Sequence, residues 1–177
     1  AGNALAAQQD INTSTQSFAV KLGATRVIYN PASGGATVVV ENPQDYPMLV
    51  QSKVLKEDKT TASSFTVTPP LFRLDGQQQS RLRVIRTGGE FPSDREQLNW
   101  LCITGIPPKA DDAWAQDGKE KKPDRVSLNV QMSISSCIKL LVRPPSVKGQ
   151  PSDSAGSMTW SHETGKLVAK NPTPFYQ

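Results

Sequence analysis

The chain of 177 residues has little of the side-chain chemistry that catalysis and metal binding require. Its single histidine, His162, stands in the turn-like segment SHETG, where a solvated loop residue is expected more often than a base or a ligand. One histidine and two cysteines are too few ligands for a zinc site, and no glycine-rich loop has the Walker spacing. We therefore expect no catalytic residues, no metal and no cofactor, and the chain is not expected to be an enzyme.

Long apolar runs and strong charge of one sign are also absent. No segment approaches the roughly 20 apolar residues of a membrane-spanning helix, so membrane insertion is not expected. The net charge is +4, but the basic residues are scattered, which makes nucleic acid a poor candidate partner. The charge cluster Asp94-Arg95-Glu96 is explained more simply by a local salt bridge or a helix-start cap than by paired acid and base catalysis.

Short strand-like segments between turn residues fill most of the chain. The 14 prolines and 12 glycines suit short strands better than long helices. Pro69 and Pro70 interrupt one segment and indicate an edge or a kink, because proline lacks the N–H of a sheet ladder. About seven strands with turn signals every 8 to 12 residues or so predict an all-β fold, an immunoglobulin-like β-sandwich. The expected segments are 18–22, 24–30, 36–42, 48–55, 64–76, 80–89, 99–108 and 126–145.

The last of these segments has the most regular pattern. Apolar and polar residues alternate strictly, which is typical of a strand with one wholly apolar face. Such a strand either lines the core of its own protein or offers an apolar row to another chain. The apolar positions are Val126, Leu128, Val130, Met132 and Ile134.

Two features bear on the compartment. Cys102 and Cys137 lie in neighbouring strand-like segments and either form a bridge, which favours an oxidising compartment, or remain buried free thiols. Ala4-Leu5-Ala6 has the small-x-small form that signal peptidases accept, although an ordinary alanine-rich tail explains it equally well. The charged segment 109–125, which contains Trp114, has five basic and five acidic residues and is expected to be a mobile loop.

Five motifs, in this order, resemble the periplasmic pilus chaperones of chaperone-usher pathways. They are LGATRVIYNP, TPPLFRLDGQQQSRLRVIRTGG, FPSDREQLNWLCITGIPP, IKLLVRPPSVKG and KNPTPFY. The two cysteines, the long tail before Phe18 and the long charged loop are similar to those of the subclass that includes the F1-capsule and Saf atypical-fimbria chaperones. The resemblance implies a periplasmic protein that binds, folds and caps fimbrial or capsular fibre subunits and delivers them to an outer-membrane usher.

The resemblance also implies roles for particular residues. In this family two cations anchor the C-terminal carboxylate of the subunit, and the matching positions are Arg26 and Lys139, which taken alone are ordinary strand cations facing water. The alternating strand becomes a donor strand that completes the subunit fold, with its apolar residues entering successive pockets. Phe18, Val20 and Leu22 either pair beside it or form an ordinary first strand of the sandwich.

The expected organisation has three parts. Residues 1–16 are a flexible N-terminal extension, 17–147 an immunoglobulin-like chaperone domain, and 148–177 a linker with the start of an incomplete second β-sandwich domain. The alternative function is a secreted structural fibre subunit or adhesin. A subunit would carry its donor segment at the extreme amino terminus, whereas the alternating strand here is internal, which favours the chaperone. Trp114 has no assigned role.

Overall fold

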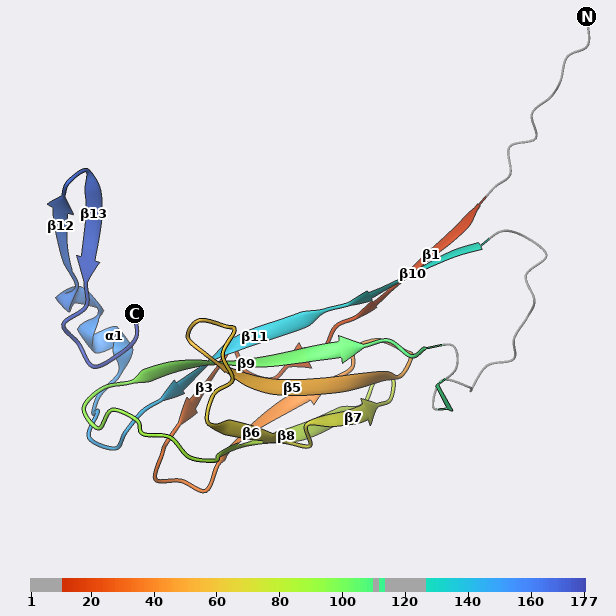
Figure 1. Ribbon diagram of the computed structural model, residues 1–177, viewed down its shortest axis with the longest axis horizontal. Helices are drawn as coiled ribbons and strands as arrows, with labels where there is room; N and C mark the ends of the chain where they lie inside the picture. The colour runs from red at the N-terminus through yellow and green to blue at the C-terminus, as the bar shows by residue number, and fades with distance from the viewer. Residues whose placement is uncertain (1–10, 110–111, 114–126) are drawn as a thin grey trace, which may run out of the picture.

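The computed structural model describes residues 11–109, 112–113 and 127–177, and strands form most of the described chain (Figure 1). Two short helical turns, α1 Pro151–Ser154 and a 3-10 turn Ala155–Ser157, follow the eleventh strand. The strands are β1 Asn12–Phe18, β2 Lys21–Leu22, β3 Arg26–Tyr29, β4 Ala36–Glu41, β5 Met48–Lys56, β6 Phe65–Thr68, β7 Leu71–Leu74, β8 Gln79–Arg86, β9 Gln97–Ile106, β10 Ser127–Ser133, β11 Ser135–Val142, β12 Thr159–Glu163 and β13 Lys166–Lys170.

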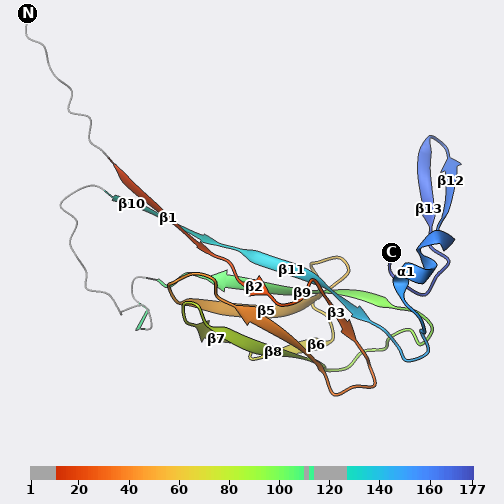
Figure 2. The ribbon, with the colours of Figure 1, turned by 180° about the vertical axis from the view of Figure 1, so that it is seen from behind.

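Two sheets pack face to face, and the apolar alternation of their strands supplies the core between them. The five-stranded sheet has the order β3-β11-β9-β5-β7, and the four-stranded sheet has the order β2-β4-β8-β6 (Figures 1 and 2). Alternate residues of each strand point inward, as period-2 patterns require. The predicted all-β, immunoglobulin-like sandwich is confirmed. The largest core side chains include Phe18, Tyr29, Met48, Leu82, Leu101 and Leu140.

The chain crosses between the sheets at the predicted interruption, Pro69-Pro70. β6 is an edge strand of the four-stranded sheet, and β7 is an edge strand of the five-stranded sheet. The two prolines lie between these edge strands, so their lack of an N–H group removes no hydrogen bond from the interior of either sheet.

A two-stranded ribbon, here called the arm, extends from the sandwich and consists of β10 and residues 12–17 of β1 (Figures 1 and 2). The two strands run parallel, with Asn12 opposite Ser127 and Phe18 opposite Ser133. The Tyr46 hydroxyl donates a hydrogen bond to the Ser17 carbonyl at 2.7 Å, and this contact fixes the base of the arm to the sandwich.

The N-terminal boundaries differ from the prediction. Residues 12–16 form part of β1 rather than a flexible extension, and the strand beside β10 is Asn12–Phe18 rather than the segment of Phe18, Val20 and Leu22. Phe18 ends the pairing strand with its ring buried, Val20 is buried in the core, and Leu22 packs against that core from β2. The polar sequence NTSTQS carries no apolar alternation, so its pairing depends on backbone hydrogen bonds that a side-chain pattern does not report.

The C-terminal residues form a hairpin and then return to the sandwich. β12 and β13 pair on either side of Thr164 and Gly165, which form the turn between them and both have positive φ. The segment 171–176 then packs against the start of β9, where Phe175 is buried. We propose that the immunoglobulin-like domain ends at residue 147 and that residues 148–177 are a linker and the start of a second β domain.

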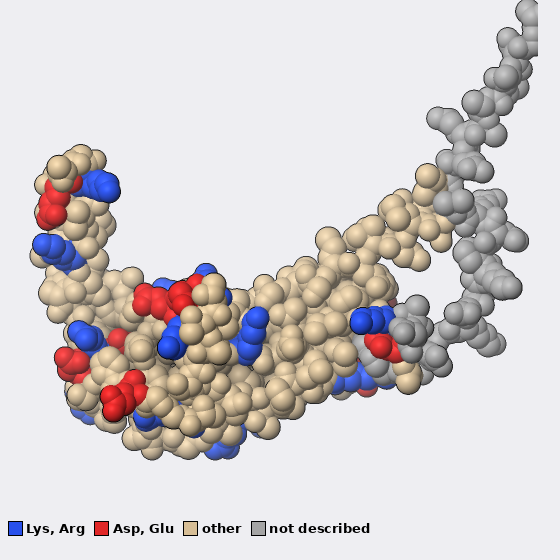
Figure 3. Space-filling view, in the orientation of Figure 1, with Lys and Arg blue, Asp and Glu red and all other residues tan. Residues whose placement is uncertain are grey.

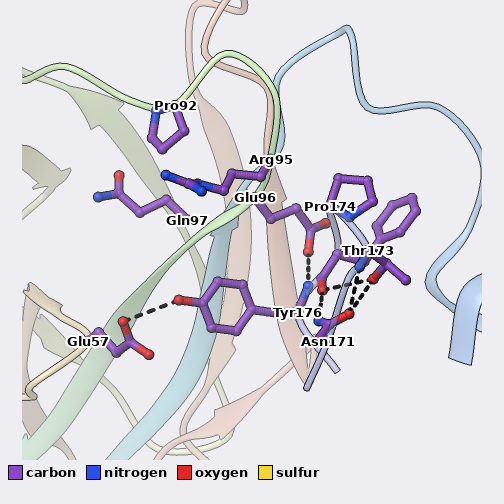
Figure 4. A pocket seen from close by; sticks show the side chains of 10 residues that line it. Glu57, Pro92, Arg95, Glu96, Gln97, Asn171, Thr173, Pro174 and Tyr176 are labelled. Carbon is purple, nitrogen blue, oxygen red and sulfur yellow. Dashed lines mark hydrogen bonds between the residues drawn. The ribbon is translucent and has the colours of Figure 1, made fainter. Parts of the chain in front are cut away.

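Glu96 holds this returning segment through several hydrogen bonds. Its buried carboxylate accepts a hydrogen bond from the Arg143 Nε at 2.5 Å. It accepts another from the Tyr176 backbone N–H at 2.9 Å (Figure 4). Its own N–H donates to the Pro174 carbonyl at 2.8 Å. Neither explanation expected for the cluster 94–96, a local salt bridge or a helix-start cap, describes Glu96. Its ion-pair partner is Arg143, 47 residues further along the chain, and it stands immediately before a strand, β9.

Candidate functional site

The apolar row of the predicted donor strand lies on one face of the arm. Leu128, Val130 and Met132 keep 53%, 38% and 45% of their surface exposed. Their neighbours across the ribbon are small, namely Thr13, Thr15 and Ser17. The row is therefore open to a partner. Ile134 is half-buried where β10 meets β11, and the predicted first residue of the row, Val126, lies outside the described residues.

The opposite face of the arm is polar but uncharged. The Ser14 hydroxyl donates to the Asn129 side chain, and the Gln131 amide donates to the Gln16 side chain at 3.4 Å. The segments 11–18 and 127–138 contain no charged residue, and Figure 3 shows the arm without acidic or basic side chains. Edge strands usually carry charges that prevent pairing with another chain. Within the described chain the second edge of β10 has no neighbouring strand, so it offers free backbone groups to another chain.

The apolar row continues from the core of the sandwich. Because side chains alternate along a strand, the even-numbered residues of β10 and β11 share one side, and on β11 this side faces the core. Leu140 and Val142 are buried there, and Ile138 packs against them. Lys139 has the opposite parity and lies on the outer face of the five-stranded sheet.

The two predicted anchor cations are neighbours in space. β3 and β11 pair in parallel, and Lys139 is the direct partner of Arg26. Arg26 is exposed and Lys139 half-buried, and neither forms a salt bridge with any residue that the structure describes. Adjacent strands lie about 4.8 Å apart, so both cations can contact one carboxylate group.

A disulfide lies between the anchor and the arm. Cys102 and Cys137 are directly opposite each other in β9 and β11 and form a bond, so the predicted bridge is confirmed. Lys139 follows Cys137 by two residues on the same face of the strand. The bridge therefore ties β11 to β9 between the point where the arm leaves the sandwich and the anchor cations.

Comparison with known proteins agrees with this geometry. Residues 19–148 match the domain family described as pili and flagellar-assembly chaperone, PapD N-terminal domain. The chain belongs to this family of pilus-assembly chaperones. It is 64% identical to the Escherichia coli chaperone protein AfaB over 93% of its own length and 67% of that protein, and it spans about two thirds of the length of the curated relatives.

Solved structures support the same assignment. The E. coli chaperone DraB is 58% identical with a TM-score of 0.80, and the match covers 93% of this chain and 73% of DraB. The Salmonella enterica SafB chaperone, solved with the SafA pilin, is 49% identical with a TM-score of 0.79, covering 94% and 74% of the two chains. The chain is thus a periplasmic chaperone, and the predicted location is confirmed. No helix among the described residues is long and apolar enough to cross a membrane.

Sequence reasoning missed two parts of the site region of this chaperone and misplaced a third. The misplaced part is β1, the partner of β10. The two missed parts are the carboxylate of Glu96 and the contact of Lys59 with Trp100. None of these has a local sequence pattern, because each joins residues far apart in the chain. Trp114 and most of the charged segment 109–125 lie outside the described residues.

Proposed function

We propose that this chaperone binds a fimbrial or capsular fibre subunit by donor-strand complementation, through binding and not catalysis. The subunit is expected to have an apolar groove where a strand is missing, and β10 would add its free edge there. The observation that carries the proposal is the exposed apolar row on an uncharged strand with an open edge. The side chains proposed to enter the groove are Val126, Leu128, Val130, Met132 and Ile134.

The anchor end of the site binds the C-terminal carboxylate of the subunit in this proposal. The guanidinium of Arg26 suits two carboxylate oxygens, and the ammonium of Lys139 adds a point charge. Their direct pairing across β3 and β11, without an acidic partner in the described chain, supports a shared anion. Lys139 and the row lie in one continuous run of residues from 127 to 142, so bound carboxylate would set the register of β10 in the groove.

Burial of the row supplies the main gain in affinity. A fully buried aliphatic side chain contributes roughly 1.5 to 3 kcal/mol relative to full exposure, and the arm already covers about half of each side chain. The three described residues therefore contribute on the order of half that amount each, before the cost of ordering the partners.

The partners follow from the family and from SafB, which was solved in complex with the SafA pilin. We propose a fibre subunit as the bound partner and an outer-membrane usher as the protein that receives it. The alternative, a structural fibre subunit or adhesin, is not favoured, because the chain matches chaperones along its length.

The test is co-expression with the fibre subunits encoded beside the gene, followed by co-purification. Lys139→Ala is expected to abolish recovery of a soluble complex, and Val130→Lys is expected to reduce it strongly. Gln131→Lys is the matched control, because the neighbouring residue points to the polar face of the same strand. Equal complex yields for Val130→Lys and Gln131→Lys, in variants that melt like the unmodified protein, would sink the donor-row assignment.

A further inference from the structure

Trp100 stands at the centre of a cross-strand row that includes the anchor cations. On β9 it is the direct partner of Lys139 on one side and of Leu55 on the other. Arg26 extends the row through its pairing with Lys139. The row lies on the outer face of the five-stranded sheet, because the neighbouring residue Leu101 points into the core.

A third cation reaches this row from a separate part of the chain. The turn between β5 and β6 lies beside β9 (Figures 1 and 2), where the Lys59 Nζ lies 3.9 Å from the centre of the Trp100 ring. The Lys59 N–H donates to the Lys56 carbonyl at 2.9 Å, and the residue adopts a positive φ of 59°. The turn therefore has a defined conformation, and the cation–π contact holds the ammonium over the indole.

The acidic residues of the same turn are occupied by other partners. The Thr61 hydroxyl and the backbone N–H groups of Thr61 and Thr60 hold the pKa of Asp58 well below its usual range. The Glu57 carboxylate accepts a hydrogen bond from the Tyr176 hydroxyl at 3.2 Å. Lys59, like the two anchor cations, forms no salt bridge with a residue in the described ranges.

Trp100 also carries a buried donor without an acceptor. Its Nε1–H is out of contact with solvent and has no hydrogen-bond partner among the described residues. A buried, unpaired N–H is unfavourable, and an oxygen acceptor brought by a ligand removes that cost. At this place three cations have no salt-bridge partner in the described chain, and one N–H donor has no acceptor.

We propose that Lys59 is a third cation of the anion anchor, alongside Arg26 and Lys139, and that Trp100 is the positioning residue that holds it. This rests on the proposed function, because the anion is the C-terminal carboxylate of the subunit. The flexible four-carbon stem of lysine lets the ammonium move from the ring toward the bound anion. The indole N–H is then free to donate to an oxygen atom of the last peptide unit of the subunit.

Inorganic sulfate is the probe for the first test, titrated at constant ionic strength into protein with 15N-labelled tryptophan. The indole N–H signal of Trp100, assigned with Trp100→Phe, is expected to shift with sulfate concentration. Lys59→Met and Lys139→Ala are each expected to weaken sulfate binding by about threefold to tenfold, whereas Lys59→Arg retains it. Lys166→Met removes the same charge from the distant β13 hairpin and is expected to change nothing.

The outcomes separate the two proposals. If Lys139→Ala weakens sulfate binding and Lys59→Met does not, the role of Lys59 is overturned and the anchor remains. If neither Lys139→Ala nor Arg26→Ala weakens sulfate binding, the anchor itself is overturned. If Lys166→Met weakens sulfate binding as much as Lys59→Met does, the protein binds an adventitious ion only, and the site is overturned. The site is also overturned if the Trp100 indole signal does not shift with sulfate concentration, because no sulfate then binds beside Trp100. In co-expression with the subunit, Lys59→Met must also lower complex yield more than Lys59→Arg does.

Discussion

The backbone carbonyl of Phe18 passes directly over Gly105. A Cβ at position 105 would lie 2.1 Å from the Phe18 carbonyl oxygen, far inside contact distance. The same carbonyl accepts a hydrogen bond from the Ile134 N–H at 3.2 Å, and the Ile134 carbonyl accepts one from the Gly105 N–H at 3.1 Å. Three chain segments therefore meet at the base of the arm, at a point where only glycine leaves room.

Gly105→Ala is expected to push β1 away from β9. Because the obstacle is backbone rather than a flexible side chain, the cost is about 1 to 3 kcal/mol in the free energy of unfolding, measured by urea denaturation. Gly156→Ala is the control, since a Cβ at 156 meets nothing within 4 Å. Equal stability of the two variants would show that the arm can shift at no cost.

Loss of the Cys102–Cys137 bridge is expected to destabilise the protein. The bonded cysteines are 35 residues apart, and closing a loop of this length stabilises by roughly 3 to 4 kcal/mol in the chain-entropy model. Chemical denaturation of the double variant Cys102→Ser, Cys137→Ser measures the change. An intact mass with two free thiols in protein purified from the periplasm would contradict the bridge.

Glu96→Ala is expected to release the C-terminal segment. The Glu96 side chain is fully buried, so its removal leaves the Arg143 guanidinium and the Tyr176 N–H without their acceptor. Breaking a buried ion pair in this way costs about 3 to 5 kcal/mol. Increased proteolysis near residue 171 and a lower urea midpoint are the readouts.

Glu41→Ala provides the comparison for that prediction. Its partner Lys21 lies 3.5 Å away and is largely exposed, so the expected loss is about 1 kcal/mol or less. Similar losses in the two variants would mean that the buried pair contributes no more than a surface pair.

The Tyr176 phenol is expected to ionise at higher pH than a free tyrosine. Burial raises its pKa, and the nearby Glu57 carboxylate raises it further (Figure 4). Since the protonated form is favoured in the folded state, this stabilisation is complete below the unfolded pKa of about 10 and is lost as the pH rises through the folded value. Absorbance titration at alkaline pH, with Tyr176→Phe to assign the signal, checks this, and Glu57→Gln is expected to lower the pKa. An unchanged titration in Glu57→Gln would remove Glu57 as a cause.

Part of the fold and of the candidate site was predictable from local pattern. The period-2 alternation located the long strand that becomes β10 and β11, and the Pro69-Pro70 interruption marked the crossing between the sheets. Arg26 and Lys139 came from the resemblance alone, since a strand cation by itself gives no sign of a ligand. The pairing of an N-terminal strand with the donor strand was one of two alternatives, but it was placed at Phe18, Val20 and Leu22 rather than at Asn12–Phe18, because the polar residues of β1 have no apolar period.

The sequence by itself determined which residues can be strand, which face of each strand is apolar, and that the chain has few groups suited to catalysis. These are local properties of side-chain type and spacing. Only the tertiary structure decided that the row from Leu128 to Met132 leaves the core on an exposed arm, that Arg26 lies beside Lys139, and that Lys59 covers Trp100. Each of these depends on contacts between distant segments, and such contacts are selected by the packing of the whole sandwich rather than by any one segment.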